Sequence, residues 1–172
     1  LPVAVILFQL ESWYGHRPLK PDESAIVSLK LKYGVEPIPE ITLTTGEGVS
    51  IETPPLRIPD EREVDWRIKA KEPGAHELKF KMPGQDVVQK IIVSADGLVR
   101  ISPLVSASDT KDLLLNPSVM SLPHGSIVEE LSIGYPANSV EIYKWHVHWL
   151  VVVLVLSIVF GFALKGLFRV EI

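Results

Sequence analysis

The sequence lacks cysteine entirely and has no excess of positive charge. Without cysteine, its 172 residues cannot form disulfide bonds or thiolate metal sites, although such chains occur in every cellular compartment. Its 17 lysine and arginine residues are outnumbered by 21 acidic residues, which gives a net charge of −4. Because the basic residues are also dispersed along the chain, the composition disfavours nucleic-acid binding.

The chain also lacks the short motifs of common catalytic sites. The nucleophile elbow, the phosphate-binding loop and zinc-ligand spacings are absent. Ser126 lies two residues after His124, but closeness along the chain does not make a catalytic triad. The acidic segments 22–23 and 60–63 lack the oxygen spacing and glycine of a cation-binding loop, so we interpret them as solvated turns. We therefore predict a protein that is not an enzyme and has no cofactor, metal or small-molecule substrate.

One long segment lacks charged residues altogether. It extends from Trp145 to Leu164 and reads WHVHWLVVVLVLSIVFGFAL. At about 1.5 Å per residue, a helix of that length spans the ~30 Å hydrocarbon core of a bilayer. We predict a transmembrane helix over residues 145–166, followed by a short cytoplasmic tail over residues 167–172. A buried core helix is the alternative, which the length and the absence of charge disfavour.

The flanks of this segment predict its orientation. Aromatic rings favour the headgroup layer, whereas lysine and arginine near a helix end favour the cytoplasmic side. We therefore place the C-terminus in the cytoplasm of a bacterial cell, with the helix in the inner membrane and the preceding domain on the periplasmic side. The predicted interfacial anchors of both apolar segments are Trp13, Tyr14, Trp145, Trp149, Lys165 and Arg169.

The start of the sequence forms a second, shorter apolar segment. Leu1–Leu10 carries no charge, but about ten residues are too few to span a bilayer as a helix. The segment also lacks the basic start and small-residue cleavage site of a signal peptide. We expect residues 1–12 to be the end of a transmembrane helix that begins upstream. An apolar strand or a re-entrant segment is the alternative.

Between these segments, residues 18–143 show the two-residue period of β-strands. Alternation is strict over Ser24–Tyr33, Glu63–Ala70 and Ala75–Met82, and it directs Tyr33 and His76 toward the core. Short strands at this spacing predict a mainly β fold, an antiparallel β-sandwich in one extracytoplasmic domain. Weaker strand candidates, separated by turn residues, are Glu40–Thr45, Val49–Thr53, Val87–Val93, Leu98–Ser102, Ile127–Gly134 and Ser139–Tyr143.

Two resemblances extend this interpretation. The segment Trp66–Phe80, with a Pro-Gly turn between two alternating strands, resembles a hairpin of bacterial immunoglobulin-like domains, which implies an immunoglobulin-like sandwich but no function. More broadly, the segment from Leu10 to Glu23, the β-domain and the closing apolar helix resemble the C-terminal portion of an uncharacterised family of bacterial multi-pass inner-membrane proteins. That resemblance implies further membrane segments upstream and no activity.

Two features suggest contacts with partners. Ser157 and Gly161, four residues apart on the predicted helix, would form a notch for membrane packing with another helix, although such a pair also arises by chance. The segment 103–126 is apolar for a loop and contains three prolines. It is a candidate docking loop or, alternatively, a cover over one end of the sandwich or a short helix. Its candidate docking residues are Leu113, Leu114, Leu115, Met120 and Leu122.

The histidines offer one weak cofactor candidate. On a helix, His146 and His148 would point about 200° apart and could not share a metal ion. On an extended segment they would share a face, but no third ligand follows. His148 is a candidate axial ligand for a porphyrin-like cofactor. We favour instead an amphipathic ring at headgroup level, and we interpret His76 as a hydrogen-bonded structural residue.

Together these observations predict a non-catalytic integral membrane subunit. Its extracytoplasmic β-sandwich would scaffold or organise a larger membrane protein complex, with the lipid bilayer and other integral membrane subunits as its partners. A component of a membrane transport or protein-insertion machine is the alternative, because such machines also place a β-rich domain between membrane helices.

Overall fold

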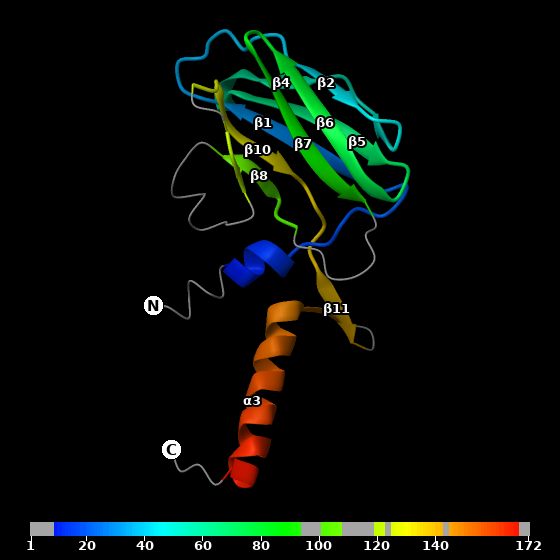
Figure 1. Ribbon diagram of the computed structural model, residues 1–172, viewed down its shortest axis with the longest axis vertical. Coiled ribbons are helices and arrows are strands. Elements are labelled where there is room, and N and C mark those ends of the chain that lie inside the picture. Colours follow the sequence, from blue (N-terminus) through cyan, green and yellow to red (C-terminus); the bar gives the residue numbers. More distant parts are fainter. Residues whose placement is uncertain (1–8, 94–100, 108–118, 123–124, 143–144, 169–172) are drawn as a thin grey trace. The chain divides into compact units, whose positions relative to one another are not determined.

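A computed structural model describes residues 9–93, 101–107, 119–122, 125–142 and 145–168. The chain divides into two compact units, Leu1–Pro136 and Ala137–Ile172. We call the first the sandwich unit and the second the helix unit (Figure 1).

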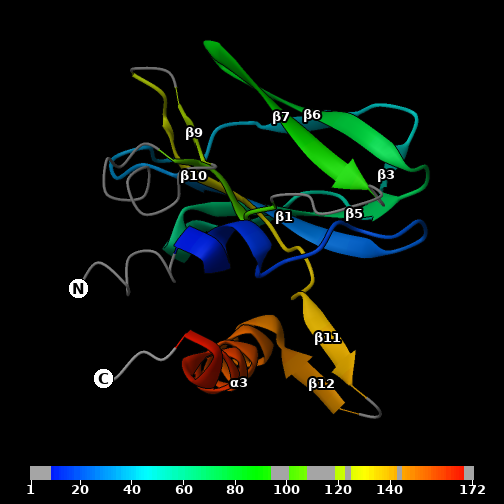
Figure 2. The same ribbon diagram turned by 60° about the horizontal axis from the view of Figure 1, so that its bottom comes forward.

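The sandwich unit is built from two β-sheets, which confirms the prediction of a mainly β fold (Figure 2). The large sheet has the strand order β3-β5-β1-β10-β8-β9 with β4 also paired to β5, and the small sheet has the order β2-β6-β7. All pairings are antiparallel except β8 with β9. The elements are β1 (Ser24–Leu31), β2 (Thr42–Thr45), β3 (Val49–Ile51), β4 (Leu56–Ile58), the 3-10 turn η1 (Pro59–Glu61), β5 (Glu63–Ala70), β6 (Gly74–Met82), β7 (Gln85–Val93), β8 (Leu104–Ala107), β9 (Met120–Ser121) and β10 (Val128–Ile133).

The core of this unit lies between the two sheets and follows from the alternation in the sequence. Strand β5 buries every second residue, and so does β7 in the facing sheet. Across the sheets, the rings of Trp66 and Phe80 meet edge to face with centroids 5.6 Å apart. Burial of each large apolar side chain stabilises the fold by about 1.5–3 kcal/mol. The largest fully buried side chains are Trp66, Phe80, Leu19, Leu29, Leu31, Ile68, Leu78, Ile91, Leu131 and Ile133.

The predicted hairpin over Trp66–Phe80 is a crossover between the sheets. Strand β5 pairs with β1, β3 and β4, whereas β6 pairs with β2 and β7. The short link 71–73 therefore carries the chain from one sheet to the other. Alternation predicts which face of a strand is buried but not which strand lies beside it, and so the predicted pairing was wrong.

The structure also corrects the predicted inward direction of Tyr33. Strand β1 ends at Leu31 after a register shift between Lys30 and Leu31. The chain then turns through Gly34, whose φ of +84° suits glycine. Tyr33 follows the end of the strand and is 86 % exposed, so the alternation stops two residues before the sequence pattern does.

Short strands account for most of the other differences. Strands β4, β8 and β9 have two to four residues each, too few for alternation to reveal them. Two of them, β8 and β9, lie in the segment 103–126, for which we expected little regular structure. The predicted strand Leu98–Ser102 lies mostly outside the described residues, and its described part, 101–102, is not a strand.

Before β1, a short helix leads to an isolated bridge with the end of β7. Residues 9–14 are helical, and residues 1–8 lie outside the described part of the chain. Leu19 is fully buried and bridges Val93 of β7 in parallel. Arg17 then holds the turn into β1 through two hydrogen bonds of 2.8 Å to the carboxylate of Glu23.

The helix unit combines a two-stranded sheet with one helix. Strand β11 (Ser139–Ile142) pairs antiparallel with β12 (Trp145–His148), and α3 (Trp149–Phe168) follows directly. The first four residues of the uncharged segment are therefore a strand, and the helix begins at Trp149. The strand predicted over Ser139–Tyr143 belongs to this unit and pairs with β12 instead of joining the sandwich.

The described side chains of α3 are largely exposed. Apart from the partly buried Val152, the large apolar side chains from Val151 to Leu164 have exposed fractions of 43–75 %. Among the described residues, no helix is both long enough and apolar enough to cross a membrane.

Candidate partner-binding pocket

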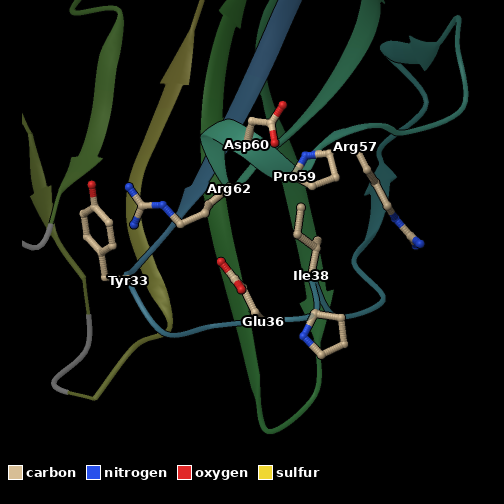
Figure 3. Close-up of a pocket in the computed structure, with 8 residues that line it drawn as sticks. Tyr33, Glu36, Ile38, Arg57, Pro59, Asp60 and Arg62 are labelled. Atoms are coloured by element: carbon tan, nitrogen blue, oxygen red, sulfur yellow. The ribbon is translucent and has the colours of Figure 1, made fainter.

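A pocket of about 600 Å³ opens between two loops of the sandwich unit (Figure 3). One wall comes from the loop that follows β1, and the other comes from β4, η1 and the residue that leads into β5. We call it the Arg62 pocket. Its lining residues are Tyr33, Glu36, Pro37, Ile38, Arg57, Pro59, Asp60 and Arg62.

The local sequence explains the shape of the second wall. Pro59 opens η1, where its fixed φ suits the first position of a helical turn. Arg62 closes the turn in the left-handed region, with φ 58° and ψ 37°, and its N–H donates to the Pro59 carbonyl at 3.0 Å. A residue with a side chain costs of order 1 kcal/mol in that region, so its other contacts must offset the strain.

Arg62 makes those contacts to three segments. Its guanidinium donates to the Leu31 carbonyl at 3.1 Å and lies 3.5 Å from the centroid of the Tyr33 ring. It also forms a longer ion pair of 3.5 Å with Oε2 of Glu129 in β10. The Leu31 N–H donates back to the Arg62 carbonyl at 2.8 Å. Arg62 is therefore held in one position, with only 11 % of its side chain exposed.

Tyr33 and the remaining charges form the accessible part of the pocket. Figure 3 shows Arg62 turned toward Tyr33 on one side, while Arg57 extends from the opposite side. Arg57 and Arg62 supply positive charge, and Glu36 and Asp60 supply negative charge. An exposed aromatic ring held against a fixed arginine, within a rim of mixed charge, is typical of protein-binding surfaces.

The acidic side chains of the pocket do not form a metal-binding cluster in the described part of the chain. No group of three histidine or acidic side chains that could hold a metal ion occurs among the described residues. Asp60 is the one acidic residue of the segment 60–63 that lines the pocket. Within that segment, burial raises the pKa of Glu63, Ser28 hydrogen-bonds to its carboxylate and lowers it, and the nearby Asp65 carboxylate raises it further. These effects on the pKa act at Glu63 in strand β5, which does not line the pocket.

The acidic segment 22–23 forms structural ion pairs. Asp22 has a φ of 68° and its carboxylate lies 3.1 Å from Nζ of Lys69. Glu23 accepts hydrogen bonds from Arg17 and from the N–H of Lys20. The Arg17 guanidinium is the main cause that lowers the pKa of Glu23 to about 2.

A second cavity, of about 190 Å³, lies beside strand β7. Burial raises the pKa of Tyr135 there to about 12, and its hydroxyl oxygen accepts a hydrogen bond of 3.3 Å from the N–H of Ile92. Nearby, Oγ of Ser106 donates to the side-chain oxygen of Gln89 at 3.0 Å. These buried polar groups satisfy one another, which suits a structural role.

The histidines form no metal-binding cluster in the described part of the chain, and His146 and His148 lie in strand β12, not on the helix. Nε2 of His76 lies 2.8 Å from the Glu72 carbonyl oxygen, in keeping with a structural histidine. Gly48 packs against the His76 ring so closely that a Cβ at this position would overlap it. His148 ends β12, and its Nδ1 accepts a hydrogen bond of 3.4 Å from the N–H of Leu150. His146 pairs with Glu141 across the β11–β12 sheet.

The predicted packing pair lies on an open face of α3. Oγ of Ser157 donates to the Val153 carbonyl at 2.7 Å, within the helix. A Cβ at Gly161 would meet no atom within 4 Å. Of the interfacial residues, the rings of Trp13 and Tyr14 meet edge to face at 6.4 Å, and those of His148 and Trp149 lie 6.2 Å apart. The remaining anchors, whose side chains lie outside the described part, are Trp145, Lys165 and Arg169.

The candidate docking loop is only partly described. Leu113, Leu114 and Leu115 lie outside the described residues. Met120 is 60 % exposed in β9, whereas Leu122 is buried in the sandwich core. Leu122 therefore fits the alternative interpretation of this segment as a cover over the sandwich.

Sequence reasoning missed the pocket. Its two walls come from proline-containing segments, 36–39 and 54–59, whose composition predicts stiff loops. That signal could have marked the loops as candidates. The contact between Tyr33 and Arg62 joins residues 29 positions apart, however, and depends on the pairing of β1 with β5.

Comparisons with known proteins do not assign this chain to a family. No protein-family model matches the chain, and no curated protein matches it. A solved crystal structure, that of the S-layer protein rSbsC, is similar over 52 % of this chain at 15 % sequence identity, with a TM-score of 0.36. The matched region covers 13 % of that protein.

Proposed function

We propose that this protein is a non-catalytic, membrane-anchored subunit whose β-sandwich binds a partner protein and so organises a membrane complex. The observation that carries the proposal is the Arg62 pocket. Its aromatic ring is exposed while its arginine is fixed by three segments. Because the Arg62 side chain is already held in place, this surface loses little side-chain entropy on binding, which favours recognition of a partner.

The strand order supports an immunoglobulin-like sandwich. In such domains one sheet has the order A-B-E-D and the other has C-F-G. With the three-residue strand β4 left out, the strands β1, β2, β3, β5, β6 and β7 follow the order B to G along the chain, and β10 takes the position of strand A. The parallel bridge between Leu19 and Val93 lies before strand B and beside strand G. Immunoglobulin-like domains commonly bind partners through their loops, and the Arg62 pocket is built from loops.

The membrane anchor rests on the helix unit and its sequence. No helix among the described residues is long and apolar enough to cross a membrane, so the proposal depends on the whole segment from Trp145 to Leu164, which has no charge, and on the exposure of most described apolar side chains of α3. Lipid tails are the environment that suits an exposed apolar surface on all sides of a helix. Lys165 and Arg169 then favour the cytoplasm for the C-terminus, which would leave the sandwich on the periplasmic side of an inner membrane.

The test compares variants of the full chain that alter the pocket surface. Tyr33→Ala and Arg57→Glu change exposed residues of the pocket, so we expect both variants to remain folded. The chain and its variants are tagged, expressed in the membrane and purified in mild detergent. We expect both variants to lose the proteins that co-purify stoichiometrically with the unaltered chain, with at least a tenfold drop in yield, about 1.4 kcal/mol of binding free energy.

Lys81→Glu is the matched control for charge, because Lys81 is an exposed residue of β6 in the small sheet. This variant should retain the same partners at the same yield. If Tyr33→Ala and Arg57→Glu also retain them, the pocket is not the binding site. If all three variants lose them, the loss reports net charge or folding, and the proposal fails in this form.

A further inference from the structure

Strand β7 forms an edge of the small sheet that is only partly paired. Over its nine residues it pairs with β6 on one side. On its other side, the pairing among the described residues is the single bridge between Val93 and Leu19. A strand edge with unpaired N–H and C=O groups is a ready template for another strand.

The hydrogen bonds show which residues face that edge. The Pro83-Gly84 turn joins Met82 to Gln85, so alternate residues from Gln85 onward bond to β6. The residues between them direct their N–H and C=O groups away from β6. The N–H of Ile92 confirms this direction, because it donates to Oη of Tyr135 and not to β6.

Contacts at one end limit the open part of the edge. Tyr135 occupies the N–H of Ile92, and Leu19 bridges the next residue, Val93. The residues left facing the edge are Asp86, Val88 and Lys90, of which Lys90 also lines the cavity beside β7 together with Ser102 and Leu104. Their side chains share the exposed face of the sheet, with Val88 at the centre and 48 % exposed. The Lys90 carbonyl has one weak contact, 3.5 Å from the side-chain nitrogen of Gln89.

We propose that two copies of this chain associate by antiparallel pairing of their β7 strands about a two-fold axis at Val88. In this register, Val88 lies opposite Val88 of the second copy. Asp86 of each copy then lies opposite Lys90 of the other, so opposite charges meet twice on the same face. The residues that pair are those whose backbone groups face the edge, which an antiparallel ladder requires.

The charge pattern is the reason to choose a second copy as the occupant. An isologous interface must be complementary to itself, so a positive group must lie as far from the axis as a negative one. Asp86 and Lys90 satisfy this condition, two residues on either side of Val88. An unrelated strand would need no such symmetry. This association goes beyond the proposed binding at the Arg62 pocket and uses none of its residues.

Disulfide cross-linking of the full chain in mild detergent tests the register. The chain has no native cysteine, so each variant carries a single thiol. In Val88→Cys the two Cα atoms would lie about 5.5 Å apart, within reach of a disulfide bond. Lys79→Cys is the matched control, because Lys79 pairs with Val88 on β6 and is also exposed. Its two copies would lie about 14 Å apart, beyond the reach of a disulfide bond.

We expect a covalent dimer from Val88→Cys at a protein concentration where Lys79→Cys gives at least tenfold less. In the Val88→Cys background, Asp86→Lys or Lys90→Asp alone should weaken association about tenfold, because each reverses two cross-strand pairs. The double change Asp86→Lys with Lys90→Asp should restore it. That rescue separates pairing between copies from damage within one copy, since Asp86 also lies opposite Lys81 and Lys90 opposite Glu77.

Two results would overturn the proposal. Equal cross-linking of Val88→Cys and Lys79→Cys would mean that β7 does not pair with a second copy. Cross-linking that the double change fails to restore would mean that the copies meet in another register. Loss of partner proteins on Tyr33→Ala leaves this inference untouched, so its failure and that of the proposed function are distinguishable.

Discussion

The two units of this chain contain similar apolar residues, but the sandwich unit buries many of them whereas the helix unit leaves most of those described exposed. In the sandwich unit, valine, leucine and isoleucine alternate with polar residues, and Val64 and Leu29 are fully buried. In α3 the same residue types follow one another without a polar residue from Leu150 to Leu156, and most of those described are exposed. A strand with alternating residues can turn one face to a core and the other to water. A helix that is apolar on all sides needs a surrounding environment to cover it.

The strongest way to sharpen this comparison is to remove one large apolar side chain from each unit. Trp66→Ala removes a ring that packs against Phe80 between the sheets, and we expect it to lower the free energy of unfolding of the sandwich by about 3–5 kcal/mol. Leu154→Ala removes an exposed side chain of α3 and should change it by less than about 0.5 kcal/mol. Urea unfolding of the full chain in detergent, followed by the β-sheet circular dichroism signal, measures both. Equal losses would contradict the distinction between the units.

A smaller effect tests how tightly the sandwich packs at its surface. Gly48→Ala would place a Cβ onto the His76 ring, and moving that ring would break its contact with the Glu72 carbonyl. We expect a loss of about 1–3 kcal/mol in the same unfolding measurement. Gly46→Ala is the control, because a Cβ there would meet no atom within 4 Å. Adding His76→Ala to Gly48→Ala should recover part of the loss, and no recovery would show that the ring is not the obstacle.

The smallest expected effect concerns charge at the entry to β1. Arg17 lowers the pKa of Glu23 from its ordinary value of 4.5 to about 2, so the folded state favours the ionised carboxylate. This contribution to stability is present above pH 4.5 and is lost as the pH falls toward 2. The two side chains are 31 % and 28 % exposed, and solvent screening reduces the gain to about 1–2 kcal/mol.

Glu23→Gln should therefore lower the free energy of unfolding by that amount at pH 7, and the difference from the unaltered chain should shrink as the pH falls from 4.5 toward 2. Glu47→Gln, in an exposed turn, is the control and should show no such dependence. Unfolding curves measured across this range of pH provide the test. A difference that stays constant with pH would mean that the ion pair is not its source.

Much of the sandwich was predictable because its strands obey a simple period. Strand β5 has the predicted bounds, and β6 differs by one residue. The pairing of these two strands was not predictable, since a strand with one apolar face packs equally well beside several others. The exposure of Tyr33 was also not predictable, because β1 ends after a register shift, before the alternation in the sequence ends.

By itself, the sequence determined which residues of the long strands face the core and where a charge-free segment lies, because both depend on the order of neighbouring residues. The tertiary structure decided which strands are neighbours and brought Arg62 to Tyr33, because those contacts join segments that the chain keeps far apart. It also decided that the uncharged segment opens as strand β12, through pairing with β11. The two-residue alternation is a local property of the chain, whereas the pocket and the β7 edge form only when the strands pair into sheets.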